Sequence, residues 1–168
     1  ALVDQSCLPD FHHSVLIDHA QRCFDVGSVN KAMDLLQRAK LVVELDSKER
    51  SDPASILRII NVHIVTATFE SGLGRAQSAE SHLKAALELS ATLQERYPLT
   101  LHSKIFRTST CALAQFYEER GDLKYALEMY KNLVCLTKKH CEDLLDPEAK
   151  LNYAWSLYYL GKFYQDQG

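Results

Sequence analysis

The sequence predicts an all-α fold in which antiparallel helix–turn–helix repeats stack into an α-solenoid of about seven helices. The first observation is a period of 47 residues, at which glycines recur: Gly27, Gly74, Gly121 and Gly168. The second is that small and large apolar residues keep fixed distances from these glycines. The third is that apolar residues follow helical spacing, without the alternation typical of strands. Because several columns share one period, each repeat is expected to form one pair of helices with its glycine in the turn.

The columns around each glycine indicate how the two helices of a repeat pack. A small residue stands seven places before each glycine: Ala20, Ala67, Ala114 and Gly161. An alanine follows each of the first three glycines by five places: Ala32, Ala79 and Ala126. A large apolar residue comes four places later: Leu36, Leu83 and Tyr130. Small residues let two backbones approach closely, so Ala114 is expected to face Ala126 across the turn.

Prolines mark the starts of the first helices. Asp52-Pro53 and Asp146-Pro147 each place an N-cap carboxylate before a proline at the first helical position, where the missing N–H needs no partner. The units are therefore expected at about 10–46, 53–96 and 98–143, followed by a lone helix at 147–167. Residues 1–9 fit either an arm or the end of a preceding helix.

Composition limits the class of protein. At 168 residues with 46% hydrophobic content, a single repeat segment with a substantial core is expected. The net charge of −3 argues against a partner such as nucleic acid or an anionic membrane. No apolar run approaches the roughly 20 residues that span a bilayer, and no signal peptide opens the chain. Five cysteines without framework spacing favour reduced thiols and a cytoplasmic or nuclear location.

Both ends of the chain suggest a segment of a longer solenoid. The chain begins at Ala1 rather than at a methionine, and it ends on Gly168, the turn position of a fourth repeat. A helix without its repeat partner exposes apolar surface, so the last helix is expected to act as a cap. Self-association through this exposed terminal helix is therefore one of the expected contacts.

Two motifs relate the repeat to a known family. Leu160-Gly161-x2-Tyr164 and Ala126-x3-Tyr130 correspond to the Leu-Gly-x2-Tyr and Ala-x3-Phe positions of the tetratricopeptide (TPR) helix–turn–helix. The chain thus resembles the TPR family in a long, 47-residue form. The period is also typical of HEAT and armadillo repeats, which the two motifs disfavour. The resemblance implies a right-handed α-solenoid; a generic antiparallel bundle with coincidental spacing is the alternative.

In the TPR family the first helices of successive units line a concave groove, and ligands contact its outward-facing positions. Carried onto this register, the resemblance implies these partner-binding residues: Ile17, Gln21, Phe24, Asn61, Ile64, Thr68, Thr108, Cys111, Gln115, Glu118, Tyr158 and Lys162. The mixture of polar and apolar side chains suits an extended peptide or a partner helix. The alternative is that these residues contact neighbouring turns of a longer solenoid, or water. Some TPR proteins hold the carboxylate tails of heat-shock chaperones with Lys or Arg and Asn at these positions; only Lys162 is basic here, which disfavours that partner class.

Metal binding and catalysis lack the residue patterns that they need. The nearest clusters of metal-ligating residue types are Cys7 with His12 and His13, and Cys135 with His140 and Cys141. Neither has the Cys-x2-Cys or His-x3-His spacing of a closed zinc site. The stretch 72–74 lacks the strand and the third glycine of a dinucleotide fingerprint, and no Gly-Lys-Ser/Thr phosphate loop occurs. We therefore expect no metal, no cofactor and no catalytic residue, and the chain is not expected to be an enzyme.

The sequence as a whole predicts a non-catalytic scaffold that binds a partner protein or peptide along a concave face. Two alternatives stay open. One is a structural spacer without a ligand, and the other is a regulatory arm that controls an enzyme elsewhere in the same complex. Neither nucleic acid nor a membrane is expected among the partners.

Overall fold

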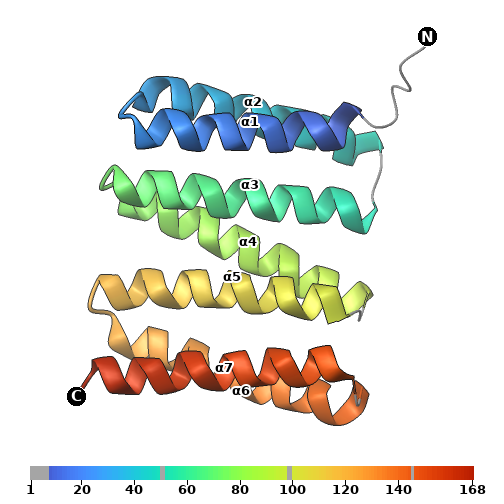
Figure 1. Ribbon diagram of the computed structural model, residues 1–168, viewed down its shortest axis with the longest axis vertical. Helices are drawn as coiled ribbons and strands as arrows, with labels where there is room; N and C mark the ends of the chain where they lie inside the picture. The colour runs from blue at the N-terminus through green and yellow to red at the C-terminus, as the bar shows by residue number, and fades with distance from the viewer. Residues whose placement is uncertain (1–7, 50–51, 98–99, 145) are drawn as a thin grey trace. The chain divides into compact units, whose positions relative to one another are not determined.

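The computed structural model describes residues 8–49, 52–97, 100–144 and 146–168, which form seven helices joined by turns, with no strand among them (Figure 1). The helices are α1 (Leu8–Asp25), α2 (Val29–Glu49), α3 (Pro53–Gly72), α4 (Ala76–Arg96), α5 (Thr100–Glu119), α6 (Leu123–Leu144) and α7 (Pro147–Asp166). For these residues, the prediction of an all-α chain with seven helices is confirmed. None of the described helices is long and apolar enough to cross a membrane.

The chain divides into two compact units, with the boundary inside α4 after Ala86. In the first unit, α1 and α2 form an antiparallel hairpin, and Val62 and Phe69 of α3 join the core that these two helices build. In the second unit, α5 and α6 form the hairpin, and α7 adds Phe163 to its core. Within this second unit, α5 and α7 run in the same direction, as expected for the first helices of successive repeats (Figure 1).

The helix starts follow the aspartate–proline signals. Asp52 has an extended backbone, and its side chain accepts a hydrogen bond of 2.7 Å from the N–H of Ser55. Asp146 caps α7 in the same manner and accepts from the N–H of Glu148 at 3.4 Å. Both predicted caps are therefore confirmed. Residues 1–9 are expected as an arm or as the end of a preceding helix; of these, residues 1–7 lie outside the described part and 8–9 belong to α1. The expected start at residue 98 also lies outside it.

The predicted turn glycines adopt the left-handed backbone conformation, with φ of 78°, 74° and 78°: Gly27, Gly74 and Gly121. In the third turn, the N–H of Asp122 donates to the carbonyl of Tyr117 at 2.8 Å, and the N–H of Gly121 donates to that of Glu118 at 3.0 Å. The turns at residues 27 and 74 have the same pair of hydrogen bonds. These bonds satisfy carbonyls at the helix end and reverse the chain, so the predicted glycine turns are confirmed.

The small-residue columns lie at the centre of the helix pairs. In the second unit, Ala114 of α5 and Ala126 of α6 are fully buried in one cluster, together with Tyr130 and Leu133. The corresponding alanines of the first unit are at most 1% exposed: Ala20, Ala32, Ala67 and Ala79. Because an alanine leaves room for the opposing backbone, these columns set the distance between paired helices. Gly161 occupies the same column in α7 and is exposed, since no described helix covers it.

Replacing Gly121 with alanine should destabilise the fold by about 1–2 kcal/mol, because a Cβ at this left-handed position clashes with the chain's own carbonyl. Beyond Gly121 and its two chain neighbours, no atom lies within 4 Å of a Cβ built there, so the cost is conformational alone. Gly161→Ala is the matched control: it lies inside α7, has the same free space, and should stabilise the helix by about 0.5–1 kcal/mol. Thermal unfolding followed by circular dichroism distinguishes them, and equal midpoints would contradict the assigned backbone.

Replacing Ala126 with leucine should destabilise the fold by roughly 1–3 kcal/mol, because the added atoms have no room between α5 and α6. Lys131 is exposed on the same helix, so Lys131→Leu should change the free energy of unfolding by less than about 0.5 kcal/mol. Urea unfolding of both variants checks this pair of expectations. If both variants lose the same stability, the register of α6 on α5 is wrong.

Candidate functional site

The predicted partner-binding residues differ in their exposure. Exposed side chains belong to Gln21, Asn61, Thr68, Thr108, Gln115, Tyr158 and Lys162. Partly buried ones belong to Phe24, Ile64 and Glu118. The remaining two, Ile17 and Cys111, are buried. The predicted partner-binding side chains therefore differ in exposure more than their shared positions in the repeat suggest.

Ile17 and Cys111 do not face outward as expected. Ile17 lies in the core of the first unit with Phe69 of α3, and Cys111 lies in the core of the second unit with Phe163 of α7. The physical reason is that a first helix packs against the first helix of the next repeat as well as against its own partner. Burial raises the pKa of Cys111 to about 12, although the charge of Arg107 acts in the opposite direction, so this thiol stays protonated.

Phe24 is a packing residue of the first unit and does not offer a free apolar surface. Its ring stacks on that of Phe69, with centroids 4.2 Å apart, and Phe69 is fully buried. A Cβ added at Gly72 would lie 3.0 Å from the Phe24 ring, so the ring also fills the space beside this glycine. Trimming Phe24 would therefore destabilise the fold, and the predicted outward-facing position is filled by a packing residue.

Polar side chains of the predicted column in the first unit hydrogen-bond within their own helices. The amide nitrogen of Gln21 donates to the carboxylate of Asp25 at 2.8 Å. The hydroxyl of Thr68 donates to the carbonyl of Ile64 at 3.1 Å. Such local bonds leave these groups with less capacity to bind a partner, because a ligand must first compete with the existing acceptor.

The structure brings three predicted residues together in the second unit. Gln115 and Glu118 of α5 and Lys162 of α7 line one pocket of about 360 Å³. The remaining lining residues add a second carboxylate and three aromatic rings: Glu119, Tyr130, Tyr159 and Phe163. An amide, two carboxylates and an ammonium thus converge beside aromatic walls, which is the combination that orients polar groups in a binding site.

A hydrogen bond fixes one carboxylate of this pocket. The hydroxyl of Tyr130 donates to Glu118 at 3.2 Å. Burial, followed by the neighbouring Glu118 charge, raises the pKa of Tyr130 far above its usual range, so the phenol keeps its proton and the hydrogen bond persists. The Tyr130 ring also stacks on Tyr159, with centroids 6.4 Å apart and an angle of 3° between the planes. The wall of the pocket is therefore held by α6 and α7 together.

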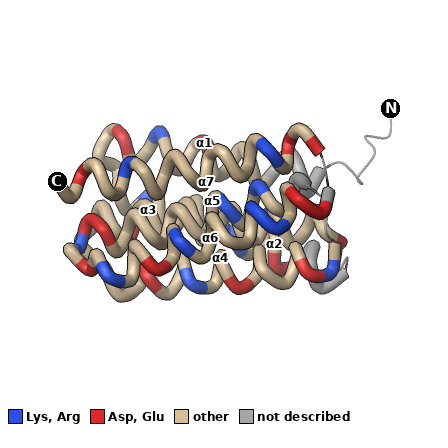
Figure 2. The backbone as a smooth tube through the Cα atoms, turned by 90° about the horizontal axis from the view of Figure 1, so that it is seen from below, with Lys and Arg blue, Asp and Glu red and all other residues tan. Residues whose placement is uncertain are grey.

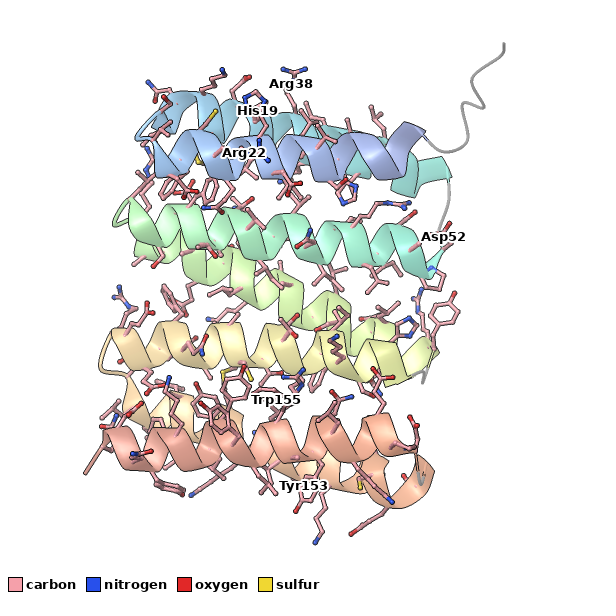
Figure 3. The ribbon with its side chains drawn as sticks, in the orientation of Figure 1. His19, Arg22, Arg38, Asp52, Tyr153 and Trp155 are labelled. Carbon is pink, nitrogen blue, oxygen red and sulfur yellow. The ribbon has the colours of Figure 1, made fainter. Side chains whose placement is uncertain are left out.

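An exposed aromatic surface lies next to this pocket on α7. Trp155 and Tyr158 are 41% and 56% exposed, and their rings meet edge to face with centroids 5.6 Å apart. They line a shallow hollow with Leu151 and Ala154. Figure 3 shows Trp155 between the ribbons of α5 and α7, whereas Tyr153 projects from the opposite side of α7. Large exposed rings on one helix face are typical of protein interaction surfaces.

Arg107 is a candidate that the sequence did not reveal. It lies on α5, is only 9% exposed, and donates from Nε to Oδ1 of Asn152 on α7 at 3.3 Å. Its guanidinium carbon is 5.9 Å from the centroid of the Trp155 ring. In the sequence Arg107 stands outside the groove column, and no local pattern distinguishes it from the other basic residues. Only the pairing of α5 with α7 identifies it.

A serine–histidine contact in the second unit does not amount to a catalytic site. Ser103 Oγ lies 3.3 Å from Nδ1 of His140, and the amide nitrogen of Gln94 donates to the same hydroxyl at 2.9 Å. A nucleophilic serine needs a base that a third group orients, and no carboxylate is bonded to His140 in the described part of the chain. The three side chains instead link α4, α5 and α6. Among the described residues, no three His, Cys, Asp or Glu side chains are grouped to hold a metal ion.

Charged residues are interspersed along the described helices rather than gathered by sign (Figure 2). Several form pairs one turn apart, such as Lys84 with Glu80 at 2.8 Å. Such pairs belong to a solvated helix surface and contribute little to stability. A large field of a single sign, which nucleic-acid binding would use, is not visible in this view.

Two histidines contact each other in the first unit. Nδ1 of His63 on α3 lies 2.9 Å from Nδ1 of His82 on α4, so one ring must donate the proton that the other accepts. Burial lowers the pKa of His63 to about 4, and the charges of His82 and Lys40 act in the same direction, with Glu44 opposing. Burial and Lys40 also lower the pKa of His82, with Glu70 opposing. The pair is therefore built to stay neutral.

No protein-family model matches the chain, and no curated protein matches it. The likeness to TPR units therefore depends on the 47-residue repeat and the two motifs described above.

The histidine pair should make the fold sensitive to acid. Unfolded histidines take up a proton near pH 6.5, whereas His63 in the fold resists protonation until about pH 4, so stability is lost as the pH falls through this window. The thermal midpoint should drop between pH 7.5 and pH 4.5, and His63→Gln should reduce that drop. His19→Gln, at an exposed position of α1, should not. An identical pH profile for both variants would exclude the pair as the cause.

Proposed function

We propose that the chain is a non-catalytic protein-interaction segment of a TPR-like, right-handed α-solenoid, and that its second unit binds a partner peptide along α5 and α7. The observation that carries this proposal is the pocket that joins Gln115, Glu118 and Lys162 beside the exposed rings of Trp155 and Tyr158. The repeated glycine turns and buried alanine columns support the solenoid arrangement.

The chemistry of the pocket suits a peptide better than a small metabolite. At about 360 Å³ it is at the lower end of small-molecule sites and has room for one or two side chains. The Gln115 amide both donates and accepts, which matches a peptide backbone, while Lys162 donates and Glu119 accepts. The adjoining aromatic rings supply apolar area at a small cost in side-chain entropy.

The first unit contributes less to this proposal. Its exposed candidates include Gln21 and Thr68, which already bond within their helices. Of its apolar candidates, Ile17 and Phe24 pack in the core and Ile64 is partly buried. We therefore assign peptide binding to the second unit. The first unit supports it as part of the scaffold.

Panning a random peptide library against the immobilised chain tests the proposal. Enriched peptides should bind the wild-type chain and lose affinity about tenfold or more when Gln115→Ala and Glu119→Gln are combined, because hydrogen bonds to charged groups contribute roughly 1.5–3 kcal/mol. Both side chains are exposed, so the thermal midpoint should hold. Glu128→Gln is the matched control, since it removes an exposed carboxylate of α6 that does not line the pocket.

Failure to enrich any peptide would favour a structural spacer instead. Enriched peptides that bind the double variant as well as the wild-type chain would place the binding surface elsewhere.

A further inference from the structure

Arg107 carries a largely buried charge without a counter-charge among the described residues. The residue is 9% exposed, and Nε donates to Oδ1 of Asn152 at 3.3 Å. In the described part of the chain, no carboxylate lies within ion-pair distance of the guanidinium, and Nη1 and Nη2 donate no hydrogen bond. Buried guanidinium groups in proteins are almost always paired, because leaving water is costly for a cation.

Asn152 adds a second unsatisfied donor at the same place. Its Nδ2 is buried and has no hydrogen-bond partner among the described residues. The amide orientation is fixed, because exchanging Oδ1 and Nδ2 would set two donors against each other at Arg107. Both residues therefore present N–H groups that have no acceptor among the described residues. An excess of donors around a cation is the environment that a carboxylate requires.

The donors lie beside an exposed surface. Nη1 and Nη2 are not among the unpartnered atoms closed off from solvent, so the tip of the guanidinium keeps access to the outside. The neighbouring Trp155 ring is 5.9 Å from the guanidinium carbon and is itself 41% exposed. A ligand that reaches Arg107 would thus contact this ring as well.

We propose that Arg107, held by its hydrogen bond to Asn152, receives the side-chain carboxylate of an aspartate or glutamate in the partner peptide, with Trp155 as the adjoining apolar wall. This inference rests on the proposed function, since it names the chemistry of the peptide that lies along α5 and α7. Arg107 is not among the partner-binding residues that the TPR resemblance implies.

The geometry of α5 also sets a spacing within the peptide. Arg107 and Glu118 are eleven residues apart in sequence, which is about 16 Å along a helix and equals about five residues of an extended chain. The pocket at Glu118 contains two carboxylates and one ammonium, and its excess of negative charge favours a basic side chain. The expected ligand is therefore an extended segment with an acidic residue and a lysine or arginine about five positions apart.

The single tryptophan of the chain provides the measurement, because Trp155 is next to Arg107 and needs no added label. The probes are a blocked octapeptide of sequence SESGSGKS and the same peptide with glutamine in place of glutamate. The glutamate peptide should shift Trp155 emission saturably and bind about tenfold or more tightly than the glutamine peptide. In Arg107→Met the two peptides should bind equally weakly.

Two controls separate recognition from structure. Arg107→Met keeps the unbranched stem of the side chain but leaves Oδ1 of Asn152 without its donor, so circular dichroism must show this variant folded at the temperature of the binding measurement. Arg120→Met removes the other guanidinium that lies over a ring, 5.5 Å from Phe116, at an exposed position, and it should leave the preference for glutamate intact.

Several results would overturn the proposal. Equal binding of the two octapeptides, or a preference for glutamate that persists in Arg107→Met, would exclude a carboxylate at Arg107. If the same peptide with phosphoserine in place of glutamate binds more tightly than the glutamate peptide, the group that Arg107 recognises is a phosphate and the proposed carboxylate is wrong. If library-selected peptides bind and neither octapeptide does, this inference fails and the proposed function stands; if no peptide binds at all, both are refuted.

Discussion

The reversal of the chain at each left-handed glycine is the constraint on which the other features depend. Two hydrogen bonds close the first helix, and the second helix begins within two residues of the glycine. Seven residues before the turn and five after it correspond to about 10 Å and 8 Å of helix, so the two small residues of a repeat lie at comparable heights. The short turn therefore brings the alanine columns together, and the alanines then allow the close approach that buries the larger side chains.

The surface on α5 and α7 is notable because its charged groups are held in place before any partner arrives. Glu118 is fixed by the phenol of Tyr130, and Arg107 is fixed by Asn152 and by the Trp155 ring. Side chains that are already ordered lose little conformational entropy on binding. A modest pocket lined by such groups can therefore select a ligand by the positions of its charges, even though the total buried area is small.

Most of the fold could be predicted from local sequence patterns. The glycine period, the aspartate–proline pairs and the apolar spacing each act within a few residues, and each led to the turn, cap or helix that the structure contains. The faces of the first helices could not be predicted as well. Ile17, Phe24 and Cys111 are covered by residues of the next repeat, such as Phe69 and Phe163, which helical periodicity alone does not place.

The candidate site was predicted only in part, for a similar reason. Gln115, Glu118 and Lys162 were found because they share a register with the repeat, and the pocket joins them. The contact of Arg107 with Asn152 links two helices that are 45 residues apart in sequence, and neither residue belongs to a repeating column. Its lack of a counter-charge becomes visible only when the neighbours of the guanidinium are known.

Tyr130 belongs at once to the core of the α5–α6 hairpin and to the wall of the pocket. Ligand occupancy of the pocket and the stability of the hairpin are therefore thermodynamically linked. A ligand that binds only the intact pocket wall adds about 2.7 kcal/mol to the stability of the fold when present at 100 times its Kd. The linkage also acts in reverse. A substitution at Tyr130 that alters ligand preference also alters the packing of the hairpin, so the pocket cannot be remodelled at this residue independently of the scaffold.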